Sequence, residues 1–238
     1  MLKYIAIIVV IIIILSGIKQ KQINDYDAGL EKKDIDEMQF RTGDIIFFRH
    51  DCPIYFYGDN GINMDIHIVK NICKPLFHFN QKYFSHCGIV VIKNKIPYVL
   101  HLTADDQYDN YTKKCIIGSP VLSSMDDVYK YKGILYYNKY IGPRIANVNT
   151  LLDEIYKSNI YLDGNIFNAF MVNLLNVGKH KSRYMVCCDF ILFVMNKFNI
   201  VDKFKYCDLN YISNICKNSK FYISKQVLIK TQLYKCLR

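Results

Sequence analysis

Tryptophan is absent from this chain of 238 residues, and glycine and proline are sparse, with 11 and 5 copies. So few glycines and prolines exclude a collagen-like or low-complexity architecture. Apolar residues make up 51% of the chain and aromatic residues 14%, which excludes wholesale disorder. A chain of this length buries a genuine core without help from a metal or from disulfides. We therefore expect one full domain with short appendages.

Cysteine is plentiful, but its spacing is not that of a metal site. The 9 cysteines include no CxxC pair, so no zinc ribbon is expected. Their number is odd, and the adjacent Cys187 and Cys188 do not fit one structural disulfide, which favours a reducing compartment with mostly buried thiols. P-loop, Rossmann and HExxH motifs are all missing. We expect neither a metal nor any other cofactor.

Negative charge is in the minority, with 21 Asp and Glu against 31 Lys and Arg, for a net charge of +10. The chain is also rich in Tyr, Phe, Ile, Asn and Lys, a composition that indicates an AT-rich genome and explains much of the lysine excess. The lysines are scattered and not clustered, so no nucleic-acid partner is expected. Nucleic-acid binding is kept as the last-ranked alternative, and it predicts a steep salt dependence of binding.

The N-terminal residues are unlike the rest of the chain. An unbroken apolar run over residues 4–15 has no polar face, which argues against a buried core helix. A helix there reaches about 22 Å, short of the hydrocarbon core of about 30 Å, but a locally thinned bilayer accepts it. We predict a single-pass membrane anchor over residues 1–18, ahead of a signal peptide, because Leu15 before Gly17 is a poor cleavage site. Residues 19–38 are predicted to be a polar linker.

The folded domain is predicted over residues 39–238. Apolar runs predict strands first and helices afterwards, which is typical of an α+β domain with an antiparallel sheet packed against helices. The predicted strands are 45–49, 86–92, 98–102, 116–117, 133–137 and 221–229, and the predicted helices are 150–156, 164–177, 187–198 and 208–216. A short turn at Lys93–Lys95 makes the second and third strands an antiparallel hairpin.

Three residues in this pattern suit nucleophilic chemistry. Cys187 stands where a helix begins, and the helix dipole together with unpaired amides favours a thiolate there. His86 opens one strand of the hairpin and His101 lies on the other, so His101 is placed to fix the tautomer of His86. Each residue taken alone is more ordinarily structural. Together they form a generalised triad of nucleophile, base and orienting group.

Four short motifs strengthen this reading through their order along the chain. They are GDIIF at 43–47, SHCGIV at 85–90, YVLH at 98–101 and YMVCCDFI at 184–191. This set resembles the circularly permuted branch of the NlpC-type papain-like cysteine hydrolases, and within it the YiiX-like group and its poxvirus relatives. The resemblance covers roughly residues 39–229. It implies a permuted papain-like fold in which the histidine precedes the cysteine.

The resemblance also implies roles for individual residues. It makes Cys187 the nucleophile, His86 the base and His101 the third residue, although that third position usually holds Glu in the YiiX-like group. Histidine there is familiar from NlpC-type and lecithin:retinol acyltransferase-like relatives. The fallback orienting groups are Asp105 and Asp106. Oxyanion or substrate contacts are expected from Cys188, Tyr184 and Asp44, with Tyr184 favoured as a packing or substrate-wall residue and Asp44 as a turn or strand-cap residue.

The predicted function is a membrane-tethered cysteine hydrolase or acyltransferase. It acts on an amide or ester bond of a peptide or lipid-like substrate, and its partners are that substrate and the membrane. The alternative is a catalytically inactive viral binding or host-interaction module that keeps the fold. Composition and resemblance together favour a viral protein in the host cell or the virion.

Overall fold

The computed structural model describes residues 10, 11, 14, 17, 18, 21, 22, 24–50, 84, 86–103, 106–130, 133–162, 184–202 and 209–230. The predicted anchor over residues 1–18 lies largely outside these residues, as does all of the predicted helix over 164–177. Within the described part of the chain, no helix combines the length and the hydropathy needed to cross a membrane.

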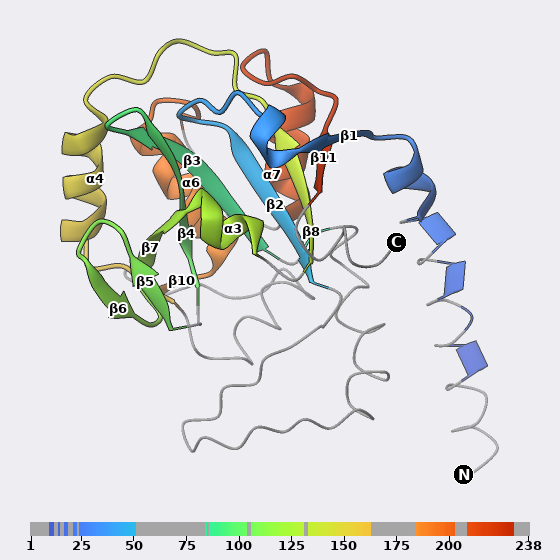
Figure 1. Ribbon diagram of the computed structural model, residues 1–238, viewed down its shortest axis with the longest axis horizontal. Coiled ribbons are helices and arrows are strands. Elements are labelled where there is room, and N and C mark those ends of the chain that lie inside the picture. The colour runs from blue at the N-terminus through green and yellow to red at the C-terminus, as the bar shows by residue number, and fades with distance from the viewer. Residues whose placement is uncertain are drawn as a thin grey trace.

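A seven-stranded sheet forms the centre of the molecule, with strands in the order β1-β11-β8-β2-β3-β4-β7 (Figure 1). Two small two-stranded sheets, β5 with β6 and β9 with β10, accompany it. The strands of the large sheet are β1 (Glu31–Asp34), β2 (Ile45–His50), β3 (His86–Lys93), β4 (Ile96–Leu102), β7 (Pro120–Ser124), β8 (Gly133–Asn138) and β11 (Val227–Lys230). Those of the small sheets are β5 (Gln107–Asp109), β6 (Lys114–Ile116), β9 (Tyr161–Leu162) and β10 (Tyr184–Met185).

The hairpin of β3 and β4 follows from its turn. Asn94 and Lys95 both have positive φ, at 52° and 66°, which is the backbone of a two-residue turn that matches the twist of the strands. This turn sets the register, with Ile89 opposite Leu100 and Lys93 opposite Ile96. The predicted hairpin is confirmed. Its register places His101 of β4 near His86 of the neighbouring β3.

Helices cover both faces of the sheet. Successive side chains of the central strands point to opposite faces, and the side chains on both faces are apolar. On one face lie α4 (Val148–Lys157), α6 (Cys187–Lys197) and α7 (Leu209–Asn218). The short α3 (Met125–Tyr129) and the 3-10 helix η1 (Ile35–Glu37) lie on the other. In Figure 1, α6 and α7 are seen behind the sheet and α3 in front of it. The prediction of an α+β domain is confirmed.

Part of the segment predicted as a polar linker, residues 19–38, belongs to the sheet. Glu31–Asp34 forms β1, which pairs in parallel with β11, so the sheet is mixed and not purely antiparallel. Just before it, Asp27 accepts two hydrogen bonds from Arg49 of β2, at 3.2 and 2.6 Å. Polar composition suggested a free tether, but these side chains are paired to the body of the domain.

Other boundaries differ by local chemistry. The predicted strand over 221–229 is shorter and starts at Val227. Helix α4 begins after Asn147, whose backbone is left-handed (φ 53°), and not after Asn149 or Thr150. Strands β5 and β7 were not predicted, because neither has a long apolar run. The domain core nevertheless lies where the apolar runs of β2, β3 and α6 indicate.

Candidate active site

Cys187 is the first residue of α6, and Val186 before it is extended (φ −87°, ψ 166°). The N-terminal turn of an α-helix concentrates partial positive charge, because its first amides have no acceptor within the helix. No side-chain cap is bonded there. The Cys187 side chain is half-buried. The start of α6 thus favours a thiolate at Cys187.

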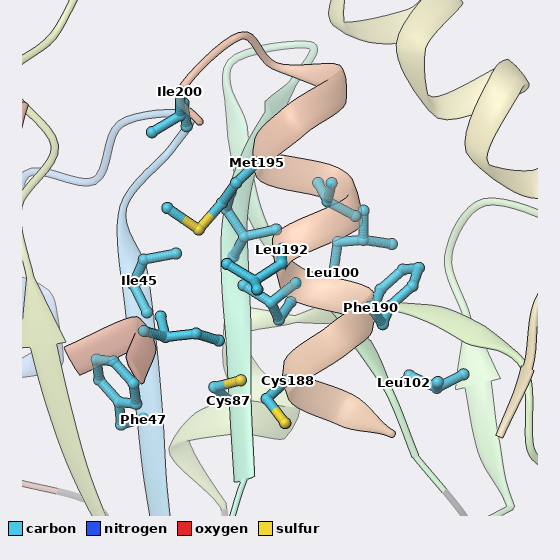
Figure 2. Close-up of a cluster of buried hydrophobic side chains, with 14 of the residues drawn as sticks. Ile45, Phe47, Cys87, Leu100, Leu102, Cys188, Phe190, Leu192, Met195 and Ile200 are labelled. Atoms are coloured by element: carbon cyan, nitrogen blue, oxygen red, sulfur yellow. The ribbon is translucent and has the colours of Figure 1, made fainter. Parts of the chain in front are cut away.

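Helix α6 is held in place by an apolar side packed on β3 and β4. Phe190, Leu192 and Met195 are fully buried, and Figure 2 shows them in the hydrophobic cluster between the helix and the strands. Cys87 of β3 and Cys188 of α6 also lie in this cluster, close to the start of α6. Because the helix is fixed by this packing, the thiol at its end is fixed as well.

His86 is the first residue of β3, so it lies at the end of that strand. Cys87, the next residue, joins the core under α6, and His86 therefore projects toward the other face. There its ring contacts Phe48 of β2, with ring centroids 5.2 Å apart. From the strand end the imidazole also makes a hydrogen bond to the Cys187 thiol. His86 thus connects the end of the sheet to the start of α6.

His101 of β4 holds the second nitrogen of His86. The distance from His86 Nε2 to His101 Nδ1 is 2.9 Å. His101 is buried and stacks on Phe48, with ring centroids 6.1 Å apart. Its other nitrogen, Nε2, lies 2.8 Å from Ser123 Oγ on β7. Since His86 Nε2 is taken by His101, Nδ1 is the nitrogen left to face Cys187.

The surroundings of Cys187 stabilise its ionised form. Hydrogen bonds from Cys188 and then from Cys87 lower the pKa of the thiol well below its ordinary value of 9.0. Burial opposes them, and the charge and hydrogen bond of His86 lower the pKa further. A thiolate is the nucleophilic form of cysteine. The surroundings of Cys187 therefore favour the nucleophilic form of its thiol.

His101 is uncharged, unlike a carboxylate in the same orienting position. Burial, and secondarily the charge of His86, lower the pKa of His101 from 6.5 to about 3. His101 is consequently neutral at physiological pH. In this neutral form His101 interacts with His86 through hydrogen bonding alone.

The remaining predicted residues are spread more widely. Cys188 is buried, and its thiol supports Cys187 directly. The backbone of Tyr184 pairs with Tyr161 between β10 and β9, shortly before Cys187, and its substrate-wall role stays a prediction. Asp106 is exposed, and Asp105 lies outside the described residues. Among the described residues, His101 is the side chain that hydrogen-bonds to His86, and its role as the third residue stays a prediction.

Asp44 is not brought to this cluster. It precedes β2 at the end where Val90 donates to its carbonyl, whereas His86 lies opposite Phe48, about 13 Å further along the strand at about 3.3 Å per residue. Its buried carboxylate accepts from the Tyr137 hydroxyl and from the Tyr140 amide, both at 2.7 Å. The expectation that Asp44 contributes to oxyanion or substrate binding is therefore corrected. It is a structural residue that ties β2 to β8 and the turn after β8.

Sequence reasoning missed three residues of the site: Cys87, Ser123 and Gln107. Cys87 stands beside His86 in the motif that was singled out, so its nearness was a signal in the sequence. Ser123 donates to Gln107 Oε1 at 3.1 Å, which extends the chain of hydrogen bonds beyond His101. A serine and a glutamine on short, weakly patterned strands give no local signal, and only the pairing of β4 with β7 brings Ser123 to His101.

A metal site is not evident among the described residues, where no group of three or more His, Cys, Asp or Glu side chains is arranged to hold an ion. No protein-family model matches the chain, and no curated protein matches it. Among solved structures, the chain is similar to the crystal structure of the metalloprotein YiiX from Escherichia coli O157:H7, with a TM-score of 0.37 and 13% sequence identity over 80% of this chain and 89% of that chain. So distant a likeness carries no argument about chemistry, which rests on the geometry of Cys187, His86 and His101.

Proposed function

We propose that the chain is a cysteine hydrolase or acyltransferase with the permuted papain-like arrangement that its motifs resemble. It acts on an amide or ester bond of a peptide or lipid-like substrate. One observation carries the proposal: a half-buried thiol with a lowered pKa is hydrogen-bonded to His86, whose other nitrogen is held by a neutral histidine. A purely structural thiol has no need of that arrangement.

In the first step the Cys187 thiolate attacks the carbonyl carbon of the substrate. The negative charge that develops on the carbonyl oxygen is stabilised at the amino-terminal turn of α6. The carbon–nitrogen or carbon–oxygen bond then breaks, and His86 gives its proton to the departing amine or alcohol. The product of this step is a thioester on Cys187.

In the second step a water molecule or another acceptor attacks the thioester. His86, now neutral, takes the proton of the acceptor through Nδ1, and the Cys187 thiolate leaves. Water as the acceptor gives a hydrolase, and an amine or alcohol gives an acyltransferase. His101 remains neutral throughout, so it holds His86 in place during both proton transfers.

An anchor over residues 1–18 directs this chemistry to substrates at a membrane. Lipids and lipidated peptides collect there, and both contain the acyl bonds that a thiolate attacks. This part of the proposal rests on the apolar run of the sequence. It is separable from the chemistry, because a variant without the anchor would keep the same thiol and histidines.

The test is acylation of the purified protein by p-nitrophenyl acetate at pH 7, with the modified cysteine identified by mass spectrometry. We expect Cys187 to be acetylated in the wild type, no acetylation of that position in Cys187→Ser, and a rate about 100-fold lower in His86→Ala. The magnitude reflects the loss of the base that deprotonates the thiol.

The matched control is Cys115→Ser, which removes an exposed thiol of β6 that lies outside the four site motifs. This variant should acetylate Cys187 at the wild-type rate. Equal labelling of wild type, Cys187→Ser and His86→Ala would contradict the enzymatic proposal. The inactive binding module would then be the better account of the fold.

A further inference from the structure

A series of hydrogen bonds continues beyond His101 and ends on an oxygen atom that can only accept. His101 Nε2 lies 2.8 Å from Ser123 Oγ, and Ser123 donates its hydroxyl proton to Gln107 Oε1 at 3.1 Å. A serine hydroxyl has one proton to give, and an amide oxygen only accepts. Ser123 Oγ is therefore left to accept from His101. It follows that the ring proton of His101 lies on Nε2.

The same reasoning carries over to His86. A neutral imidazole has one N–H, so His101 protonated at Nε2 presents an unprotonated Nδ1. His86 Nε2, which lies 2.9 Å from that nitrogen, must then be the donor. The proton of a neutral His86 ring is thus on Nε2, and its Nδ1 carries the lone pair. That lone pair is what a base beside the Cys187 thiol requires.

We propose that Gln107 and Ser123 are positioning residues that set the tautomer of His86 through His101. The inference rests on the proposed function, because it takes His86 as the base. The importance of this direction is clear when every donor and acceptor in the series of hydrogen bonds is exchanged. A donor at position 107 would make Ser123 give its proton to His101 Nε2, so His101 would donate from Nδ1 and His86 would be left with a proton on the nitrogen that faces the thiol.

The neutrality of His101 makes this chain directional. A doubly protonated ring would donate from both nitrogens whatever Ser123 does, so the protonated nitrogen of His86 would not depend on Ser123. Burial lowers the pKa of His101 to about 3, so only the neutral ring is present at physiological pH. The acceptor at the far end is the amide oxygen of Gln107, which Ser123 reaches at 3.1 Å.

Gln107 is held over Ser123 by the residue two places further along β5. Asp109 is fully buried, and its Oδ1 accepts from the amide of Leu122 at 2.8 Å and from the Tyr156 hydroxyl at 2.6 Å. Leu122 directly precedes Ser123 on β7. The carboxylate thus clamps β5 against β7, and this fixes the reach of Gln107 to the serine hydroxyl.

The experiment compares full-length wild type, in detergent, with variants that differ in polarity at this end of the chain. Gln107→Glu keeps an acceptor, Gln107→Lys supplies only donors, and Ser123→Ala breaks the chain. Two matched controls stand on the same strands. Tyr108→Lys adds the same charge at an exposed neighbouring position, and Ser124→Ala removes a hydroxyl that bonds to Asp127.

The first readout is the nitrogen chemical shifts of histidine side chains in protein labelled with ¹⁵N-histidine, which distinguish a ring protonated at Nε2 from one protonated at Nδ1. We expect the Nε2–H form of His101 in wild type, Gln107→Glu and both controls. We expect the Nδ1–H form in Gln107→Lys and a mixture in Ser123→Ala. A merely structural role for Gln107 would leave the tautomer unchanged.

The second readout is the rate of Cys187 acetylation by p-nitrophenyl acetate. Gln107→Lys and Ser123→Ala should be about 10- to 100-fold slower than wild type, whereas Gln107→Glu and Ser124→Ala should stay within about 3-fold. A nearby lysine by charge alone favours a thiolate and speeds the reaction, so a slower Gln107→Lys separates polarity from charge. Tyr108→Lys shows the size of the charge effect.

The proposal is overturned if His101 keeps the Nε2–H form in Gln107→Lys and in Ser123→Ala. It is also overturned if Gln107→Lys reacts like Tyr108→Lys. Failure of the proposed function has a different signature, because Cys187 would then not be acetylated even in the wild type while the tautomer still followed residue 107. The Gln107 variants keep the test decisive if the buried Ser123→Ala protein does not fold.

Discussion

At the scale of single residues, Asp44 and His101 are both buried ionisable groups, and burial favours the neutral form of each. For His101 the consequence lies in the proposed mechanism, where a neutral ring passes the direction of hydrogen-bond donation from Ser123 to His86 and does not compete for the proton of His86. For Asp44 the result concerns stability. Burial raises the pKa of Asp44 from 3.8 to about 6, against the opposing effect of hydrogen bonds from Tyr140, Tyr137 and Arg41.

We expect the difference in unfolding free energy between wild type and Asp44→Asn to change with pH. The folded protein keeps the Asp44 proton to a higher pH than the unfolded chain does. The stabilisation from this bound proton is complete below the unfolded pKa and is lost as the pH rises through about 6. Between pH 4 and 7 the wild type should lose up to about 3 kcal/mol relative to the variant.

Urea unfolding of both proteins at several pH values in that range measures the effect. The amide variant loses hydrogen-bond acceptors at every pH, so only the pH dependence of the difference is informative. A constant difference would mean that the three hydrogen bonds balance burial, and one that moves in favour of the wild type as the pH rises would mean that they outweigh it.

At the scale of elements, the close approach of β3 and β4 positions the two histidines. Gly88 lies two residues after His86 on β3, and a Cβ there would come within 2.4 Å of Val99 Cγ1 and 3.3 Å of His101 Cβ. The strands can therefore stay this close only with glycine at this position. The 2.9 Å contact between the imidazole rings depends on the same spacing.

Gly88→Ala should force the two strands apart. We expect a loss of about 1–3 kcal/mol of stability from the overpacked side chains. We also expect Cys187 acetylation to be about 10- to 100-fold slower, because small misplacements of catalytic groups are costly. Thermal unfolding and labelling kinetics measure the two effects.

Gly29→Ala is the matched control for this substitution. Its nearest neighbour would be the Tyr26 carbonyl oxygen at 3.6 Å, which is an ordinary contact. A Gly88→Ala protein that matched Gly29→Ala in both measurements would show that the β3–β4 spacing does not limit the site.

At the scale of the whole molecule, the N-terminal segment is joined to the centre of the sheet by a buried ion pair. Asp27 and Arg49 approach to 2.6 Å, and their side chains are 16% and 9% exposed. The hydroxyl of Tyr136 on β8 donates to the same carboxylate at 2.7 Å. Asp27, Arg49 and Tyr136 are far apart in the sequence, and their side chains therefore hold one another in place.

We expect Asp27→Ala to lower the unfolding free energy by about 3 kcal/mol or more, because it leaves the Arg49 charge buried without its partner. Glu154→Ala is the control, since it removes a partner of Lys197 in an exposed pair that should contribute at most about 1 kcal/mol. Chemical denaturation measures both. Equal losses in the two variants would show that the N-terminal segment is not part of the cooperative unit.

The sequence by itself determined the elements that carry the site. The apolar runs predicted β2 and β3, the short turn predicted the hairpin that sets His101 beside His86, and the start of an apolar helix marked Cys187. These are local properties, since periodicity and turn chemistry are read over a few neighbouring residues. They placed Cys187, His86 and His101 on their elements, and the order of the four motifs along the chain joined the three residues into one predicted site.

Only the tertiary structure decided what surrounds those residues. Asp44 shares a motif with strand β2, but the direction of the strand carries it away from His86. Ser123 and Gln107 reach His101 through the pairing of β4 with β7 and the clamp at Asp109, and β1 joins β11 from the other end of the chain. Contacts of this kind depend on long-range strand order and on single polar side chains, which leave no periodic trace in the sequence.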